Sequence, residues 1–216
     1  MAFLCNTTWL LPYKRAIVDW HVFSTISRMT YTGQTGELFS AGASGDLRTL
    51  GRSARVVAAV HTQDEFDMLF KLIFHHERRI AMRSIDAVEK ISRKHPHFID
   101  SHKEQLWALL NDDPTIDVKR HLVQIISRLE LSTPEFRKAW SLLTHWAVNP
   151  NESRIVRVNS LQSLFELAER RTEPLLMQSF RSVVRSIERE RVPSISARIR
   201  RLRNKYLQLH KASPKK

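Results

Sequence analysis

Apolar residues recur at a constant interval of 38 residues along the last two thirds of the chain. Three series share this register: Ile85, Val123, Leu161 and Ile199; Val88, Ile126, Leu164 and Leu202; and Ile80, Val118 and Val156. Within each unit these positions lie five and three residues apart, on one side of a helix with about 3.6 residues per turn. The pattern predicts one amphipathic helix with a buried stripe in every unit.

Another helix precedes this one in each unit, and a weaker apolar series marks it. Its apolar positions are Leu72, Leu110 and Val148, together with Phe98 and Phe136. Two sets of prolines recur at nearly the same spacing: Pro96, Pro134 and Pro174 where first helices begin, and Pro114, Pro150 and Pro193 in the turns before second helices. Proline lacks an amide hydrogen, and this costs least at these places, because amides in the first turn have no acceptor within the helix.

Capping residues agree with these boundaries. Thr62 and Glu65 have the spacing of a capping box, and Asp113 and Thr133 each precede a proline and are good N-caps. The sequence therefore predicts helix pairs at residues 63–94, 98–129, 134–170 and 173–209.

Glycine divides the chain sharply, because all five glycines lie in the first 51 residues. Two-residue β-hairpins and phosphate-cradling loops both depend on glycine for positive φ or for close backbone approach. Their absence after residue 51 favours helices joined by short turns. We therefore predict an all-α fold, an α-α superhelix or solenoid of about four helix pairs.

Two units carry the same signature at the turn before the second helix. Residues 112–126 (DDPTIDVKRHLVQII) and 149–164 (NPNESRIVRVNSLQSL) each have a polar turn, a valine followed by a basic residue, and an aliphatic helix rich in leucine, isoleucine or valine. This resembles HEAT or armadillo repeats, although the interval of 38 is shorter than their usual ~40–47 residues. The resemblance implies stacked helix pairs and leaves the function open, because helical-repeat families serve unrelated roles.

The first part of the chain lacks the repeat register. We predict a poorly ordered arm over residues 1–44, a loop and lead-in helix over 45–61, the HEAT-like repeat domain over 62–209 and a basic tail over 210–216. Met29 is an alternative start that would remove much of the arm. The apolar residues 1–11 have no basic residue ahead of them, so we expect no export signal.

Composition narrows the setting of the protein. Cys5 is the only cysteine, which excludes an intramolecular disulfide and a cysteine-based zinc site. No stretch approaches the roughly 18 apolar residues that a membrane-spanning helix needs. We expect a cytoplasmic monomer that requires no cofactor.

Charge is concentrated at the end of the chain. Residues 181–216 hold twelve Lys or Arg against two Glu, a net +10 out of +13 for the whole chain. The candidate polyanion-binding residues are Arg198, Arg200, Arg201, Arg203 and Lys205. They suit phosphate backbones, while a terminal repeat also needs a polar outer face for solubility alone. Nucleic-acid or other polyanion binding is therefore the second hypothesis.

Catalytic and metal-binding patterns are missing. The chain has no GxSxG elbow, no HExxH and no glycine-rich phosphate loop after residue 51. Five histidines lie close together in the sequence, at predicted turns where we expect exposed side chains and no metal site: His75, His76, His95, His97 and His102.

One enzyme class remains as a third hypothesis, because some DNA glycosylases are built from HEAT-like repeats. Such an enzyme would need Trp and Asp side chains lining a basic concave groove. Trp107, Trp140 and Trp146 fall on predicted first helices, and Asp112 and Asp113 fall in a turn. Core packing and helix capping account for these residues better.

The leading hypothesis is a non-enzymatic scaffold that binds a protein or peptide on its concave face. In a HEAT-like stack this face is formed by the side of the second helices opposite the buried stripe. The candidate binding residues there form ladders of mixed amides and charges: Arg83, Asp86, Lys90, His121, Gln124, Arg128, Asn159, Gln162 and Glu166.

Overall fold

The computed structural model describes residues 56–112, 114–171 and 173–211, and the regular secondary structure of these ranges is entirely helical. The odd-numbered helices are α5 (Gln63–Lys71, continued by a 3-10 turn at Leu72–Phe74), α7 (Lys103–Asn111, preceded by a 3-10 helix at Pro96–His102), α9 (Thr133–Val148) and α11 (Pro174–Glu188). The even-numbered helices are α6 (Arg78–Lys94), α8 (Ile116–Ile126), α10 (Arg154–Arg171) and α12 (Pro193–Lys211). These bounds lie within three residues of the predicted helix pairs.

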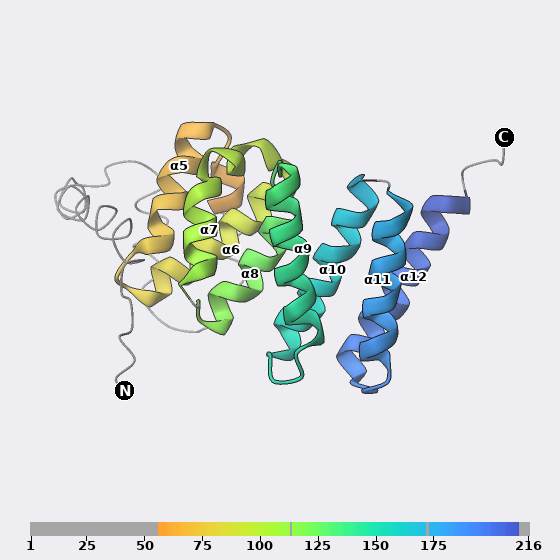
Figure 1. Ribbon diagram of the computed structural model, residues 1–216. Helices are drawn as coiled ribbons and strands as arrows, with labels where there is room; N and C mark the ends of the chain where they lie inside the picture. The colour runs from red at the N-terminus through yellow and green to blue at the C-terminus, as the bar shows by residue number, and fades with distance from the viewer. Residues whose placement is uncertain (1–55, 113, 172, 212–216) are drawn as a thin grey trace, which may run out of the picture. The chain divides into compact units, whose positions relative to one another are not determined.

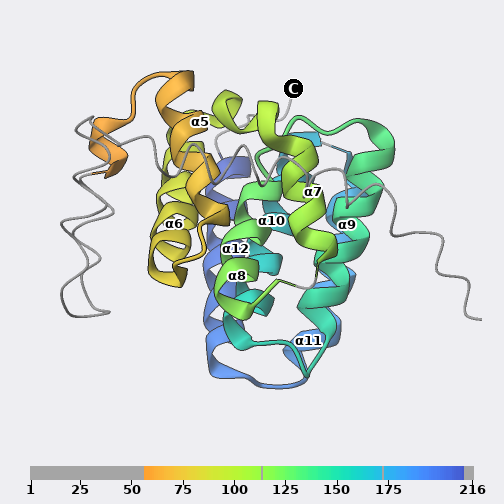
Figure 2. The same ribbon diagram turned by 90° about the vertical axis from the view of Figure 1, so that its left-hand side faces the viewer.

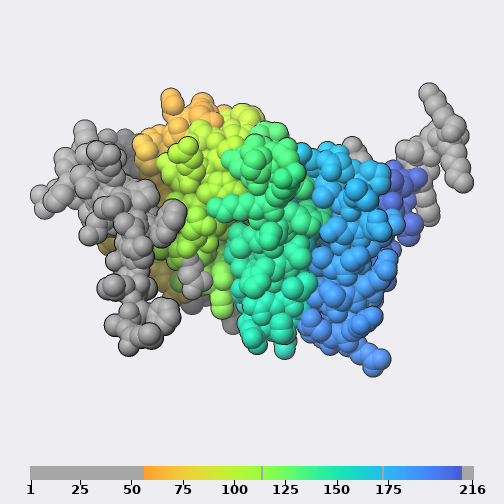
Figure 3. Space-filling model, viewed as in Figure 1, coloured from red at the N-terminus to blue at the C-terminus, as the bar shows by residue number. Residues whose placement is uncertain are grey.

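The helices form two layers, and successive helix pairs lie side by side from α5 to α12 (Figure 1). The even-numbered helices pack against one another in order, α6 on α8, α8 on α10 and α10 on α12. Figure 2 places α7, α9 and α11 on one side and α6, α8, α10 and α12 on the other. The space-filling view shows the pairs as contiguous bands (Figure 3). This is an all-α solenoid of helical repeats.

The apolar stripe of the even-numbered helices forms the core between the layers. The two strict series are buried in all of their members: Ile85, Val123, Leu161 and Ile199, and Val88, Ile126, Leu164 and Leu202. The third series is buried only at Val156, because Ile80 and Val118 lie in the first turns of α6 and α8 and are half-buried. Burial of each large aliphatic side chain stabilises the fold by about 1.5–3 kcal/mol.

Helix caps follow the predicted pattern with one correction. Thr62 and Glu65 form a capping box at the start of α5. At α9 the N-cap is Ser132 rather than Thr133, because Ser132 forms the capping box with Glu135 and Thr133 is already helical. Asp113, the other predicted cap, lies outside the described residues.

His102 also differs from its prediction as an exposed turn residue. It is buried in the 3-10 helix before α7, where its ring stacks on Phe70 with centroids 3.9 Å apart. Its Nε2 lies 2.7 Å from Oδ1 of Asp67 on α5. His102 thus ties the first two odd-numbered helices together, because the 3-10 turn packs inward instead of looping into solvent.

The lead-in helix and the terminal segments are covered only in part. Residues 56–59 are helical, and Val56 and Val60 are buried. The predicted arm at residues 1–44, most of the loop and helix at 45–61 and the end of the basic tail lie outside the described residues, so those domain limits stay predictions.

Candidate functional site

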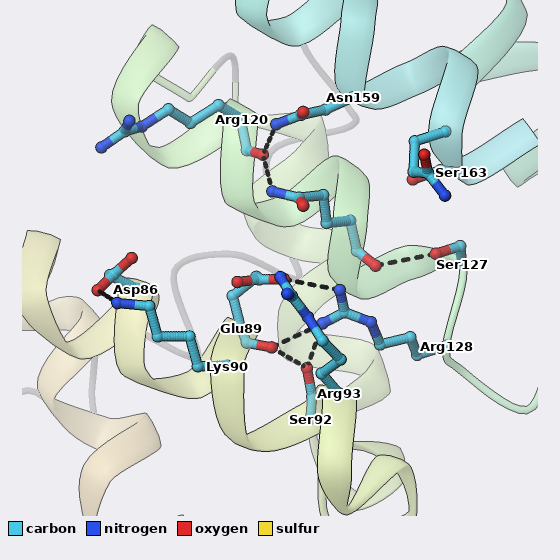
Figure 4. Close-up of polar contacts among 12 residues, drawn as sticks. Asp86, Glu89, Lys90, Ser92, Arg93, Arg120, Ser127, Arg128, Asn159 and Ser163 are labelled. Carbon is cyan, nitrogen blue, oxygen red and sulfur yellow. Dashed lines mark hydrogen bonds and ion pairs between the residues drawn. The ribbon is translucent and has the colours of Figure 1, made fainter. Parts of the chain in front are cut away.

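Polar side chains join α6 and α8 on the face of the even-numbered helices (Figure 4). Nη2 of Arg128 lies 2.6 Å from Oε1 of Glu89, and its Nη1 donates to the Glu89 carbonyl at 2.6 Å. The same Nη1 donates to Oγ of Ser92 at 2.9 Å. Arg128 therefore binds both the side chain and the backbone of α6, which sets the position of α8 along it.

Glu89 is the centre of this cluster, with 3% of its surface exposed. Arg93, one turn further along α6, donates a second ion-pair hydrogen bond to its Oε1 at 2.7 Å. Burial raises the pKa of the Glu89 carboxyl, but hydrogen bonds from Arg93 and Arg128 outweigh burial and leave that pKa below its usual value. The cluster therefore contains an ionised carboxylate between two guanidinium groups.

Side chains of α10 bond to backbone carbonyls of α8. Nδ2 of Asn159 donates to the Arg120 carbonyl at 2.9 Å, and Oγ of Ser163 donates to the Val123 carbonyl at 2.6 Å. Figure 4 shows Asn159 reaching across from α10 to Arg120. Asn159 is buried and satisfied by this bond, so the concave-face role predicted for it is replaced by a helix-joining one.

A chain of hydrogen bonds continues from α8 through α10 to α12. Oγ of Ser127 donates to Glu166 at 2.9 Å, and Gln162 donates to the other oxygen of Glu166 at 2.7 Å. Nη1 of Arg198 on α12 then donates to Oε1 of Gln162 at 2.8 Å. Burial lowers the pKa of Arg198 and outweighs the attraction of Glu166. Arg198, a candidate polyanion-binding residue, is therefore half-buried and already bonded to α10.

His121 of α8 is an unusual member of the face because it is buried without a hydrogen bond. Its two ring nitrogens contact no donor or acceptor among the described residues. Burial lowers its pKa, and the positive charge of Arg120 lowers it further. The side chain is therefore a neutral imidazole in the interior, and it does not line the concave face as predicted.

A groove of about 640 Å³ runs beside these contacts across α6, α8, α10 and α12. Its floor reaches Phe165 of α10, and Leu209 of α12 lies at its edge. Cations and anions both line it: Arg93, Arg128, Arg170, Arg198 and Lys205, with Glu130, Glu166 and Glu169. We call this the central groove.

Half of the charged residues that line the central groove, Arg93, Arg128, Glu130 and Arg170, form ion pairs. Glu130 and Arg170 form an ion pair at 2.9 Å, with side chains 80% and 41% exposed. Arg170 also donates to the Ser127 and Leu129 carbonyls at 2.5 and 3.3 Å, which anchors it to the end of α8. The floor is therefore rigid and the rim offers both signs of charge.

The comparison with known families decides the class of the protein. A family model described as a HEAT repeat domain matches residues 49–206, which is 158 of the 216 residues. The chain belongs to the HEAT-repeat family. The resemblance expected from residues 112–126 and 149–164 is thereby confirmed, and the HEAT-repeat chain is a helical-repeat scaffold. No curated protein and no solved structure gave a significant match.

The predicted concave-face residues of this HEAT-repeat chain separate into two groups. Gln124, Arg128, Gln162 and Glu166 line the central groove. Five others do not: Arg83, Asp86, Lys90, His121 and Asn159. Of these, Asp86 and Lys90 form an ion pair within α6 at 2.6 Å, and Arg83 is half-buried.

The five predicted polyanion-binding cations do not share one surface. Arg198 and Lys205 line the central groove, and Arg203 pairs with Glu188 of α11 at 2.8 Å. Arg200 and Arg201 are exposed on α12. The end of the HEAT-repeat stack is therefore basic on several sides rather than along one stripe.

Sequence reasoning missed Arg93, Glu169 and Arg170 as groove residues. Arg93 and Glu169 lie 76 residues apart, twice the interval of 38, so the repeat spacing contained a signal for both. Glu89 and Ser127 are likewise 38 residues apart. These positions were not singled out because they flank the buried stripe, where a helix pattern alone does not tell exposed from buried polar residues.

The third hypothesis required Trp and Asp in the groove, and the described groove residues include neither. Trp146 is buried, and Trp107 lies beneath the Lys138 ammonium at 4.6 Å on the odd-numbered side. Among the described residues, no group of three His, Cys, Asp or Glu side chains has the arrangement of a metal site. The helices described are also too short or too polar to cross a membrane.

Proposed function

We propose that this HEAT-repeat chain binds an extended segment of a partner protein in the central groove. The observation that carries the proposal is the groove itself: about 640 Å³, lined from four consecutive even-numbered helices, with an apolar floor at Phe165 and charges of both signs. HEAT-repeat scaffolds use extended concave surfaces of this kind to hold other proteins. The volume lies within the ~300–1,000 Å³ typical of ligand sites.

Rigidity of the floor supports binding. Arg128, Ser127 and Gln162 are already bonded to neighbouring helices, so little side-chain freedom is lost when a partner docks on them. Each long side chain that must be ordered on binding costs about 0.5–1.5 kcal/mol. Preformed contacts avoid that cost and favour a defined binding geometry.

Charges at the rim favour a protein segment over a phosphate backbone. Glu130 and Glu169 would repel a polyanion, while Lys205 offers pairing to acidic side chains. A polypeptide can present matching charges of both signs together with apolar side chains for the floor near Phe165 and Leu209. A nucleic acid presents only negative charge along its backbone.

Polyanion binding through α12 is the second candidate. The observation that favours it is the composition of residues 173–211, with ten Lys or Arg against three Glu, a net +7. Only Arg200, Arg201 and Lys205 of the five predicted cations are exposed without a carboxylate partner among the described residues. This supports weak contact with a duplex rather than a dedicated site.

Photo-crosslinking tests the proposal while the partner is still unidentified. A photo-reactive benzoylphenylalanine replaces Glu169 in the groove, and in the control it replaces Ser141, which is exposed on α9 and away from the groove. Both proteins are irradiated in a nuclease-treated lysate, and captured peptides are sequenced. The proposal expects a defined polypeptide attached at position 169 and not at 141.

A result with the same adducts at both positions would mean that capture is non-specific. Recovery of nucleic acid at position 169 before nuclease treatment, with no polypeptide after it, would support the polyanion function instead.

A further inference from the structure

A second depression lies between the last two helices, α11 and α12, which are the blue pair of Figure 1. It measures about 410 Å³ and is separated from the central groove by Phe165 of α10, which borders both. Its apolar lining is Phe165, Met177, Phe180, Val184, Ile199, Leu202, Tyr206 and Leu207. We call it the terminal cleft.

The apolar lining of the terminal cleft rises from a buried floor to an exposed edge. Ile199 and Leu202 are 2% and 3% exposed, whereas Leu207 is 53% exposed. The floor is continuous with the core, because the ring of Phe180 packs against Phe165 with centroids 5.7 Å apart. The cleft is thus an extension of the hydrophobic core that opens at the surface.

Its position explains why it is open. In a repeat stack each pair covers the apolar side of the pair before it. Helix α11 packs against α9 and α10, and α12 packs mainly against α10 and α11, as the last helix described. The terminal cleft is therefore where one more helix would pack if the stack continued.

Three arginines surround this apolar opening. Arg181 and Arg185 of α11 and Arg203 of α12 line the cleft, and its described lining residues include no Asp or Glu. The Arg181 guanidinium lies 5.1 Å from the ring centroid of Tyr206, which holds it at the edge. Arg203 pairs with Glu188, which lies outside the lining.

We propose that the terminal cleft is a docking site for an amphipathic helix of a partner protein whose polar flanks are acidic. Leucine or phenylalanine side chains at helical spacing would cover Leu202 and Leu207, and flanking carboxylates would meet Arg181, Arg185 and Arg203. Apolar anchors in a pocket with a charged rim are the usual arrangement of helix-in-groove recognition.

Other occupants fit these features less well. A second copy of the chain, docked face to face, would bring the same three arginines against each other, and like charges at an interface oppose association. A nucleic-acid backbone would satisfy the arginines but leave the apolar floor in contact with phosphate and water. The site is distinct from the central groove, because Phe165 alone lines both and the rim residues Arg181 and Arg185 belong to α11.

A model peptide gives a direct test with the full chain. The probe is a fluorescein-labelled helical peptide of about 18 residues, or five turns, with leucine at i, i+3, i+4 and i+7, glutamate on the flanks of that stripe and alanine elsewhere. A second peptide has the same composition with the leucines spread around the helix. Fluorescence anisotropy measures both affinities, and we expect saturable binding of the first peptide only.

Matched substitutions locate the binding. Leu207→Gln and Arg181→Glu should each raise the Kd of the first peptide by about tenfold or more. Their controls are Leu175→Gln and Arg189→Glu, because neither residue lines the cleft. Leu175 is 75% exposed on α11, and Arg189 is the C-cap of that helix. The controls should change the Kd less than about twofold.

Four results would overturn the proposal. The first is no saturable binding up to about 1 mM peptide, which is the Kd of very weak complexes. The second is equal affinity for both peptides, and the third is an equal loss of affinity in the control variants. The fourth is binding only to a duplex oligonucleotide or to vesicles of anionic lipid. A dimer that sedimentation detects, and that Leu207→Gln dissociates, would show that a second copy occupies the cleft. Changes in the central groove leave this assay unaffected, so the two sites can fail separately.

Discussion

Arg128, two residues after the end of α8, and Glu89 on α6 are 39 residues apart in the sequence and lie 2.6 Å apart between Nη2 and Oε1. Their side chains are only 13% and 4% exposed. This buried ion pair joins two consecutive even-numbered helices at the edge of the central groove, so it links the stability of the stack to the shape of the groove.

Removing one partner of this buried ion pair should strongly destabilise the folded protein. Arg128→Met leaves Glu89 buried with Arg93 as its remaining partner, and we expect a loss of about 3 kcal/mol in the free energy of unfolding. Urea denaturation followed by circular dichroism measures it. The control Arg78→Met removes an exposed pair with Asp117, whose arginine is 78% exposed, and should cost less than about 1 kcal/mol. Equal losses would contradict the buried character of the Arg128 pair.

The repeat register should mark the core positions. Leu161 is fully buried in α10, and Leu161→Ala should cost about 2–5 kcal/mol because it leaves a cavity. Gln208 is exposed on α12, and Gln208→Ala should cost less than about 0.5 kcal/mol. Gln162, the residue next to Leu161, bonds to Glu166 and Arg198 and is therefore unsuitable as a neutral control. A small loss for Leu161→Ala would place the wrong face of α10 in the core.

Stability should fall in mild acid through His121. Its pKa is lowered in the folded protein, so the unfolded chain takes up a proton first, near its ordinary pKa of about 6.5. The contribution of the neutral imidazole is complete above that pH and is lost as the pH falls toward the folded pKa. Among the charged groups that face it, Arg120 and Lys90 oppose protonation while Asp86 and Glu89 favour it.

Unfolding free energies between pH 7.5 and pH 5 test this, a range that spans ordinary histidine titration at about 6.5. The wild type should lose stability across the range, and His121→Leu should lose less. His75, whose pKa is also lowered by burial, provides a comparison through His75→Gln. A pH dependence that is the same in His121→Leu and the wild type would show that another group is responsible.

Binding to duplex DNA should be weak and only moderately salt-dependent. If Arg200, Arg201 and Lys205 are the contacts, the log-log slope of affinity on salt should be no steeper than about −2.7, at −0.9 per contact. Titration of a labelled duplex between about 50 and 200 mM salt measures the slope. A slope near −4.5, which all five predicted cations would give, would restore the polyanion function to first place.

Part of this structure follows directly from the sequence. The spacing of Leu161 from Val123 and Ile199 predicts the buried stripe, because a helix repeats its faces regularly and each unit packs on its neighbour. The prolines and the capping residues predict the helix ends. The error at Ser132 is one residue, because either Ser132 or Thr133 has the side chain of an N-cap.

Most of the groove contacts could not be predicted in the same way. A pattern tells which face of a helix carries Arg128 or Gln162, but not that a neighbouring helix lies close enough for their side chains to meet. Packing of consecutive even-numbered helices buries His121 and Asn159 on a face that looks polar in the sequence. The 3-10 turn at Pro96–His102 similarly draws His102 into the core.

The central claim is that the central groove binds a polypeptide segment, and two matched variants of α12 test it most directly. Lys205 lines the groove and Arg201, four residues earlier, does not, so Lys205→Glu and Arg201→Glu change the net charge equally. The segment captured by crosslinking at position 169 is synthesised and titrated into each protein by calorimetry. We predict that Lys205→Glu raises the Kd by about tenfold, or 1.4 kcal/mol, and Arg201→Glu by less than about twofold. Equal effects of the two variants, or no effect of Lys205→Glu, would contradict the claim.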